Sequence, residues 1–182
     1  MKKTITPSQI KQNNRSLIYH FIYKNKKVSQ QDISFALRLS LPTITTNLAA
    51  LERDGLIRKN GLISTEYVGR KACAYSIVPD YRISFGVEIL KKEVKCIAVN
   101  LYGEKIERMV YEIPFERSSS YFQAVCHKIL EFKDSLGIAE EQILGMGFAM
   151  QGLVTPDKRT VMYGEILSCT GLSIEEFSRH LP

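Results

Sequence analysis

Small and hydroxyl-bearing side chains are concentrated between Pro42 and Thr46, and the cationic side chain of Arg53 follows them. Threonine hydroxyls donate and accept hydrogen bonds, so Thr43, Thr45 and Thr46 can contact base edges in a DNA groove, where Pro42 adds apolar contact. Arg53 is suited to a phosphate oxygen. Solvent-facing helical surfaces usually carry Lys and Glu, so this composition favours DNA binding over an ordinary solvated helical hairpin.

The surrounding sequence predicts that these residues lie on the second of two short helices joined by a tight turn. Ser29 and Ser40 are the expected N-caps, and Asp32 completes a capping box with Ser29. Pro42 is tolerated in the first turn of the second helix. Apolar residues recur at helical spacing on the inner faces: Ile33, Ala36, Leu37, Ile44, Leu48 and Leu51. This pattern is typical of a helix-turn-helix whose second helix enters a DNA groove.

Flanking elements complete a winged helix-turn-helix domain, which we place at residues 1–78. Segment 14–24 has apolar residues at helical spacing and supplies a third helix. Segments 56–63 and 71–78 are strand-like, and Pro79 and Asp80 mark the boundary. The basic residues expected to contact phosphates are Arg53, Arg58, Lys59 and the cluster of Lys24, Lys26 and Lys27.

Positive charge is concentrated in the same part of the chain. The chain has 25 Lys and Arg residues and 19 Asp and Glu residues, a net charge of +6. Residues 1–75 contain 13 basic and 4 acidic side chains, a net of +9, whereas residues 76–182 contain 12 and 15, a net of −3. A surface that contacts phosphates requires such a local excess. Because no basic amphipathic helix has a broad apolar face, the distribution indicates double-stranded DNA as the partner and no membrane.

Residues 79–182 show a different pattern, which predicts a second domain. Three β-rich runs form an expected antiparallel meander: Ile83–Ile89, Val94–Leu101 and Lys105–Ile113. A helix is expected at 118–136, followed by 143–150, whose small residues predict a central strand. The remainder is expected to form a loop at 152–157, a short strand at 161–163 and a helix at 173–180.

Four stretches of the chain resemble regulators of the ROK family, which comprises repressors, sugar kinases and unassigned reading frames. Asn14–Ile22 resembles the first helix of these regulators, and Glu52–Ile57 follows their helix-turn-helix pattern. Gly69-Arg70-Lys71 lies where they carry Gly-Arg-Pro, and Gly145–Val154 resembles their Gly-Ile-Gly-Ile-Ala-x-Pro-Gly-Leu-Val run. The resemblance implies an α+β chain, with an N-terminal winged helix-turn-helix followed by the first part of an actin-like, sugar-kinase-like α/β domain.

The function that this resemblance implies is a DNA-binding transcriptional regulator that represses carbohydrate-related genes. A sugar or sugar phosphate would be the effector of the full-length protein. Arg70 of the wing is expected to enter a narrow minor groove, with Lys71 beside it as a further DNA contact. Gly152 and Glu165 are the expected effector-binding residues, Glu165 standing where the family carries an asparagine.

The chain departs from the pattern of the sugar kinases in this family. Those kinases bind nucleotide phosphates with an Asp-x-Gly-x-Thr turn, whereas Gly86–Lys92 has Glu88 for the aspartate, Leu90 for the glycine and no threonine. The glycine matters because the backbone must approach the phosphates closely. We therefore expect no catalytic residue and no enzymatic activity. A ROK-type sugar kinase remains the enzyme alternative, and a winged-helix module that binds protein instead of DNA is a third interpretation.

The cysteines and histidines are scattered, at Cys73, Cys96, Cys126, Cys169, His20, His127 and His180. This spacing predicts no metal site and no cofactor, and it is typical of reduced thiols in a cytoplasmic protein. No apolar run is long enough to span a membrane. The chain ends at Pro182, within what corresponds to the first half of a sensor domain. We therefore expect a truncated chain, with a homo-oligomer only for the full-length protein.

Overall fold

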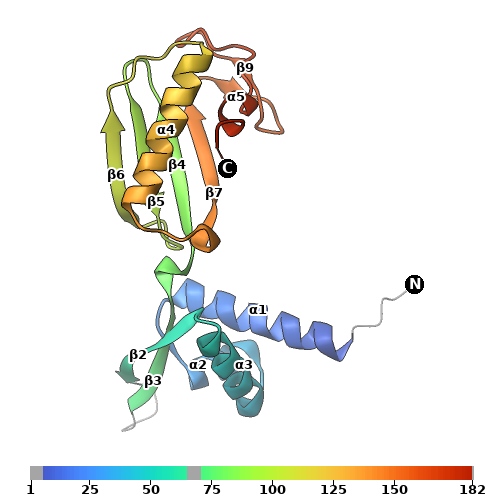
Figure 1. Ribbon diagram of the computed structural model, residues 1–182. Helices are drawn as coiled ribbons and strands as arrows, with labels where there is room; N and C mark the ends of the chain where they lie inside the picture. Colours follow the sequence, from blue (N-terminus) through green and yellow to red (C-terminus); the bar gives the residue numbers. More distant parts are fainter. Residues whose placement is uncertain (1–5, 65–70, 182) are drawn as a thin grey trace, which may run out of the picture. The chain divides into compact units, whose positions relative to one another are not determined.

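The chain divides into two compact units after Tyr81. The structure is a computed structural model that describes residues 6–64 and 71–181 (Figure 1). The first unit includes three residues beyond the expected boundary at residue 78, and these residues, Pro79–Tyr81, form a short 3-10 helix. The Tyr81 ring lies against the backbone at Gly55, where an added Cβ would be 3.6 Å from Tyr81 Cε2.

Besides that 3-10 helix, the described part of the first unit contains three α-helices and a small antiparallel sheet. The helices are α1 (Pro7–Asn25), α2 (Gln30–Leu37) and α3 (Leu41–Arg53), and the strands are β1 (Val28–Ser29), β2 (Ile57–Ser64) and β3 (Lys71–Ile77). The strand order is β1-β3-β2. This arrangement is a winged helix-turn-helix, in which α2 and α3 form the motif and β2 and β3 form the hairpin of the wing (Figure 1).

Local signals set the ends of α2 and α3 as expected. Ser29 Oγ accepts a hydrogen bond from the Asp32 amide at 3.1 Å, and Asp32 accepts one from the Ser29 amide at 2.7 Å, which completes the capping box of α2. Ser40 Oγ caps α3 by accepting from the Thr43 amide at 3.4 Å. Between the helices, Arg38 adopts the left-handed conformation with φ 54°.

Two features of this unit were not expected from the sequence pattern. Helix α1 begins at Pro7, earlier than the expected start at residue 14, because Thr6 forms a capping box with Gln9. Strand β1 has only two residues and is therefore too short to show the alternation by which strands are recognised. Its pairing with β3 joins segments that are far apart in the sequence.

The core of the first unit lies between the helices and the sheet. Its most buried large side chains are Ile18, Ile22, Ile33, Ile44, Leu48, Leu51, Ile57 and Ile77. The expected inward positions of α3 are confirmed. In α2, however, Ala36 is exposed and Leu37 is half-buried, contrary to the expectation that both face inward with Ile33. Residues three and four positions after Ile33 lie to either side of it around the helix axis, so each falls at the margin of the buried stripe.

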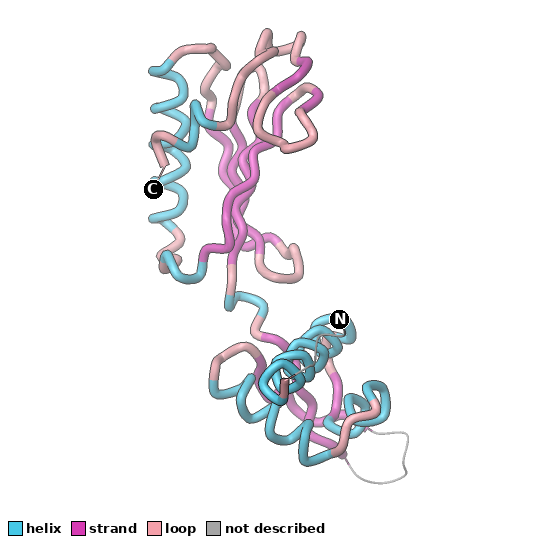
Figure 2. Tube along the Cα trace, turned by 90° about the vertical axis from the view of Figure 1, so that its right-hand side faces the viewer, coloured by secondary structure: helices cyan, strands magenta, loops and turns pink. Residues whose placement is uncertain are grey.

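The second unit is built on a four-stranded sheet with the order β6-β5-β4-β7. Strands β4 (Ile83–Ile89), β5 (Val94–Val99) and β6 (Lys105–Tyr111) form the expected antiparallel meander, and β7 (Ile143–Met150) runs parallel to β4. Helix α4 (Ser119–Ser135) connects β6 to β7 and lies along one face of the sheet (Figures 1 and 2). The core fills the space between them, where the rings of Phe85 and Phe132 meet edge to face at 6.0 Å.

Strand β7 lies at an edge of the sheet in the part of the chain that the structure describes, so the expectation of a central position is wrong. The connection through α4 places β7 beside β4, and its other edge has no strand partner among the described residues. Gly145 and Gly147 and the apolar residues around them are compatible with either position. The sequence run therefore could not distinguish an edge strand from a central one.

Two expectations for residues 152–180 are also wrong in part. The expected loop at 152–157 contains a two-residue strand, β8 (Leu153–Val154), which pairs with β9 (Val161–Tyr163). The helix expected at 173–180 is also shorter than expected: α5 covers only Glu175–Ser178. After α5 the hydrogen bonds join residues three positions apart, as in a 3-10 helix: the His180 amide donates to the Phe177 carbonyl at 3.0 Å.

Candidate nucleic-acid interface

Helix α3 has one apolar buried face and one polar exposed face. The buried face was described above. The exposed residues are Leu41 at its first position and then Pro42, Thr45, Thr46, Ala49 and Arg53. Small side chains on this face allow the helix backbone to approach a surface closely, whereas long side chains would hold it away. The exposed face can therefore enter a groove of duplex DNA, which is wide enough to admit an α-helix.

The hydroxyls of Thr45 and Thr46 are oriented by the helix itself. Thr45 Oγ1 donates to the Leu41 carbonyl at 2.8 Å, and Thr46 Oγ1 donates to the Pro42 carbonyl at 3.0 Å. Each hydroxyl has one proton and two acceptor sites, so in this state Thr46 presents acceptor capacity outward. An external acceptor can also compete for the proton by rotation of the hydroxyl.

Thr43 differs from the other two threonines. It is half-buried, and its Oγ1 lies 2.9 Å from Ser40 Oγ at the N-terminus of α3. Gln30 was not selected from the sequence, yet its side-chain amide donates to Thr45 Oγ1 and, at 3.4 Å, to the Leu41 carbonyl. Gln30 follows the N-cap of α2, and only the packing of α2 on α3 shows that it reaches the exposed face.

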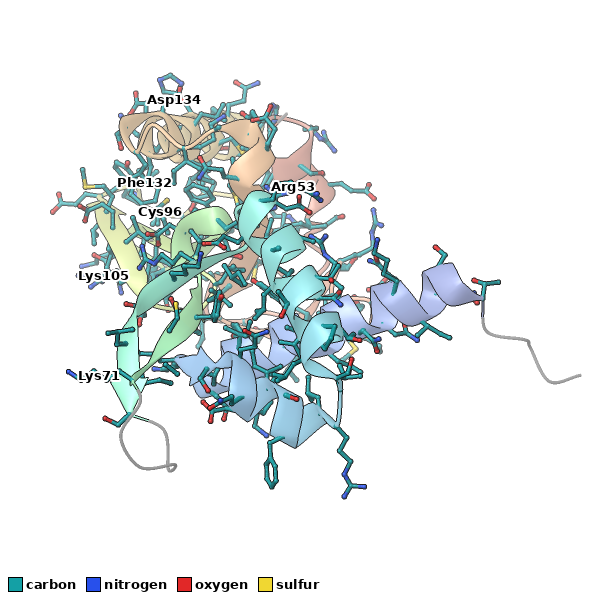
Figure 3. All side chains as sticks on the ribbon, turned by 90° about the horizontal axis from the view of Figure 1, so that it is seen from below. Arg53, Lys71, Cys96, Lys105, Phe132 and Asp134 are labelled. Atoms are coloured by element: carbon teal, nitrogen blue, oxygen red, sulfur yellow. The ribbon has the colours of Figure 1, made fainter. Side chains whose placement is uncertain are left out.

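A hollow of about 800 Å³, which we call the α1–α3 groove, lies between α1 and the exposed face of α3. From α1 it is lined by Ser8, Lys11, Gln12 and Arg15, and from α3 by Thr45, Thr46, Asn47, Ala49, Ala50 and Arg53. Arg53 lies at the C-terminal end of α3 in the view from below (Figure 3). The α1 residues were missed, although Lys11 and Arg15 lie one helical turn apart on the early part of a helix.

Asp54 joins α1 to the C-terminal end of α3. Its Oδ2 accepts from Arg15 Nη2 at 2.6 Å, and its Oδ1 accepts from Arg53 Nε at 3.2 Å. The hydrogen bond from Arg15 is the main reason that the pKa of Asp54 lies below its ordinary value, and the bond from Arg53 adds to the effect. Asp54 therefore stays ionised and holds both guanidinium groups at neutral pH.

Basic residues also extend along the wing. Arg58 and Lys59 are exposed on β2, and Lys59 Nζ lies 3.5 Å from Glu52 Oε2. Lys71 is the exposed first residue of β3, and Figure 3 shows it well separated from Arg53. Arg70 lies outside the described residues. The structure thus distributes the basic residues selected from the sequence over α3 and the wing hairpin and does not gather them at one point.

Gly152 and the segment that carries Glu165 lie close together. A Cβ added at Gly152 would be 2.6 Å from the Tyr163 carbonyl oxygen and 3.3 Å from Gly164 Cα. Both Gly152 and Glu165 are exposed. A hollow of about 60 Å³ between β7, β9 and α5 is lined by neither of them. The close approach of the backbone explains the glycine at position 152 without a ligand.

The segment compared with the kinase phosphate turn is mostly strand. Gly86 and Glu88 lie within β4, and Glu88 Oε2 is 3.4 Å from Lys95 Nζ on the neighbouring strand. The turn itself follows, where the Leu90 amide donates to the Glu93 carbonyl at 2.9 Å. The Leu90 amide is therefore already bonded within the turn, and the Leu90 side chain replaces the glycine that lets a backbone approach a phosphate closely.

A comparison with protein-family models identifies the same helix-turn-helix that the structure shows. Residues 13–58 match the family model described as winged helix-turn-helix DNA-binding. This match spans most of α1, all of α2 and α3, and the start of β2. A search of curated protein sequences finds no significant match. None of the helices in the described ranges is both long enough and apolar enough to cross a membrane.

Solved structures resemble the chain at low sequence identity. A ROK family transcriptional regulator, described as a homologue of the E. coli MLC protein, has 19% identity and a TM-score of 0.63 over 94% of this chain and 44% of that chain. A putative sugar kinase from Cytophaga hutchinsonii has 18% identity and a TM-score of 0.44 over 55% of this chain and 33% of that one. A Campylobacter jejuni peroxide stress regulator has 13% identity and a TM-score of 0.30, with coverage of 79% and 90%.

The likeness to the ROK regulator confirms the expected fold, a winged helix-turn-helix followed by an α/β domain of the kind found in that protein. The resemblance seen in the sequence is thus confirmed at the level of the fold. The chain spans less than half the length of that regulator.

Proposed function

We propose that this chain is a DNA-binding transcriptional regulator that reads base edges with α3 and contacts phosphates with the wing. The observation that carries the proposal is the exposed face of α3 within a winged helix-turn-helix, where small and hydroxyl-bearing residues lie next to Arg53. The net charge of +9 over residues 1–75 supports it, because contacts with phosphates supply much of the affinity of such proteins.

Individual residues have distinct proposed roles. Pro42, Thr45 and Thr46 contact base edges, and Thr43 contributes mainly by fixing the start of α3. Arg53, Arg58, Lys59 and Lys71 contact phosphates, and Arg70 enters the minor groove beside the wing. Carbohydrate-related genes are the proposed targets and repression is the proposed effect, both from the fold shared with the ROK regulator.

Selection of bound duplexes from a random pool tests this proposal. The full chain should enrich one sequence motif, and binding to that motif should weaken steeply as salt rises. Lys71→Ala should weaken binding, whereas Lys105→Ala, an exposed charge in the second unit, should have no effect. No enrichment and no duplex binding at low salt would contradict DNA binding and favour the protein-interaction module instead.

We propose that the second unit senses a sugar or sugar phosphate and does not transfer phosphate. The ion pair that occupies Glu88 and the glycine-free turn at Leu90–Glu93 support the absence of nucleotide chemistry. Gly152 and Glu165 are the proposed effector contacts. Titration with hexoses and hexose phosphates, followed by a thermal shift assay, tests the binding, and Glu165→Ala should abolish the shift. Hexose-dependent ATP turnover that is lost in Glu88→Ala would establish the sugar kinase alternative.

A further inference from the structure

We propose that the α1–α3 groove holds one sugar-phosphate strand of bound DNA, with Lys11 and Arg15 of α1 as phosphate ligands. This inference rests on the proposed DNA binding by α3. It adds a contact element, the first half of α1, which lies outside the helix-turn-helix. The strand would be the one that borders the groove entered by the exposed face of α3.

The charge of the groove matches a phosphate strand. Its lining includes the cationic side chains of Lys11, Arg15 and Arg53 and no carboxylate, and the three cations exceed the single charge of Asp54, which bonds to Arg15 and Arg53 from outside the lining. Ser8 and Gln12 add neutral hydrogen-bonding groups on the α1 side. Hydroxyl and amide side chains, together with Arg and Lys, are the usual ligands of phosphate and sugar oxygens in DNA complexes.

Both cationic residues in the first half of α1, Lys11 and Arg15, line the α1–α3 groove. Lys11 and Arg15 lie four residues apart, so both project from one helical face toward the groove. Asp54 accepts one hydrogen bond from Arg15, through Nη2, and one from Arg53, through Nε. A guanidinium has five N–H donors, so each arginine retains donors for a phosphate while Asp54 fixes its position. Asp54 is therefore a positioning residue for this contact.

The first half of α1 contributes little to the hydrophobic core. The buried residues of α1 are Ile18 and Ile22, which lie in its second half, whereas Lys11 and Gln12 are exposed. A helical segment that buries little apolar surface gains little from packing. The Thr6–Gln9 capping box nevertheless extends α1 along α3 and so forms the second wall of the groove.

Salt-dependent binding of the full chain tests the contact. Fluorescence anisotropy with a labelled duplex carrying the selected motif gives the slope of log affinity against log salt. Each phosphate contact contributes about −0.9 to this slope, so Lys11→Ala should make it shallower by about 0.9. It should also weaken binding to random and selected duplexes equally. Lys11→Arg keeps the charge and should retain the wild-type slope, and Lys105→Ala should change neither quantity.

A phosphate-specific readout separates contact from folding. Ethylation interference should reveal a phosphate whose modification weakens binding of the wild-type chain but not of Lys11→Ala, even if the variant has a lower melting temperature. A wild-type slope in Lys11→Ala, or the same interference pattern in both chains, would overturn the groove contact and leave DNA binding by α3 intact. Failure of the wild-type chain to bind duplex DNA would overturn the proposed function and this inference together.

Discussion

Arg15 donates a hydrogen bond to Asp54 across 39 positions of the sequence, with a distance of 2.6 Å between Nη2 and Oδ2. The bond joins the middle of α1 to the residue that ends α3. Because Asp54 also accepts from Arg53, one carboxylate orients a cation from each wall of the α1–α3 groove. Arg15 and Asp54 thus link α1 to the C-terminal end of α3 outside the buried core that the two helices share.

The first prediction concerns the titration of Asp54. Its pKa should lie below the ordinary value of 3.8, and Arg15→Ala should raise this pKa more than Arg53→Ala, because the hydrogen bond from Arg15 is the larger cause. Carbon-detected NMR titration of the side-chain carboxyl measures both effects. Equal shifts in the two variants would show that the Arg15 contact is not the dominant one.

The same shift has a consequence for stability. A carboxylate whose folded pKa is lowered contributes stability above its unfolded pKa of 3.8, and this contribution is lost as pH falls through the folded pKa. The free energy of unfolding of Asp54→Asn should therefore approach that of the wild type at acidic pH and fall below it near neutrality. Urea unfolding at several pH values provides the comparison.

The second prediction concerns base reading by Thr46. Replacement of its hydroxyl in Thr46→Val should relax the preference for one base of the selected motif by about 1 kcal/mol, the net value of one hydrogen bond. The salt slope should stay at the wild-type value, because no phosphate contact is lost. Thr46→Ser retains the hydroxyl and serves as the matched control. An unchanged motif in Thr46→Val would remove Thr46 from the reading surface.

The third prediction concerns Gly152. A Cβ at this position would lie 2.6 Å from the Tyr163 carbonyl oxygen, closer than real Cβ contacts. Gly152→Ala should therefore lower the stability of the second unit by about 1–3 kcal/mol, because the β8–β9 pairing must shift. Gly147→Ala is a control with open space around the added methyl group. Equal stability of the two variants, measured by urea unfolding, would contradict this packing role.

The fourth prediction concerns thiol reactivity. Burial raises the pKa of Cys96 and of Cys126 to about 11, and both side chains are buried in the second unit, whereas Cys73 is half-buried on β3. At about pH 8 a thiol reagent should modify Cys73 first in the native protein, because its side chain is more accessible and because the raised pKa values of Cys96 and Cys126 leave few of those two thiols ionised. Mass spectrometry of a time course should show Cys96 and Cys126 modified only on unfolding. Modification of Cys96 as fast as that of Cys73 would indicate that the sheet opens readily in the native protein.

Short-range chemistry made the helix-turn-helix predictable from the sequence. The capping box of Ser29 and Asp32 and the cap at Ser40 each involve residues three positions apart. Ile44, Leu48 and Leu51 recur at the helical period, which identifies the buried face of α3 and therefore the exposed one. The meander of β4, β5 and β6 was equally visible, because alternation and short turns are local patterns.

The tertiary structure decided everything that depends on a partner distant in the chain. The sequence alone determined which face of α3 is exposed and that the charge of the first unit is positive. It did not show that α1 forms a second wall beside α3, because that depends on the packing of α1 against α3, which buries Ile18 and Ile22 and brings Arg15 to Asp54. Nor did it show that β7 lies at one edge of the sheet formed by the described residues, since strand order depends on which edge the α4 connection reaches. Periodicity reports which side of an element is buried, whereas only folding determines what lies against it.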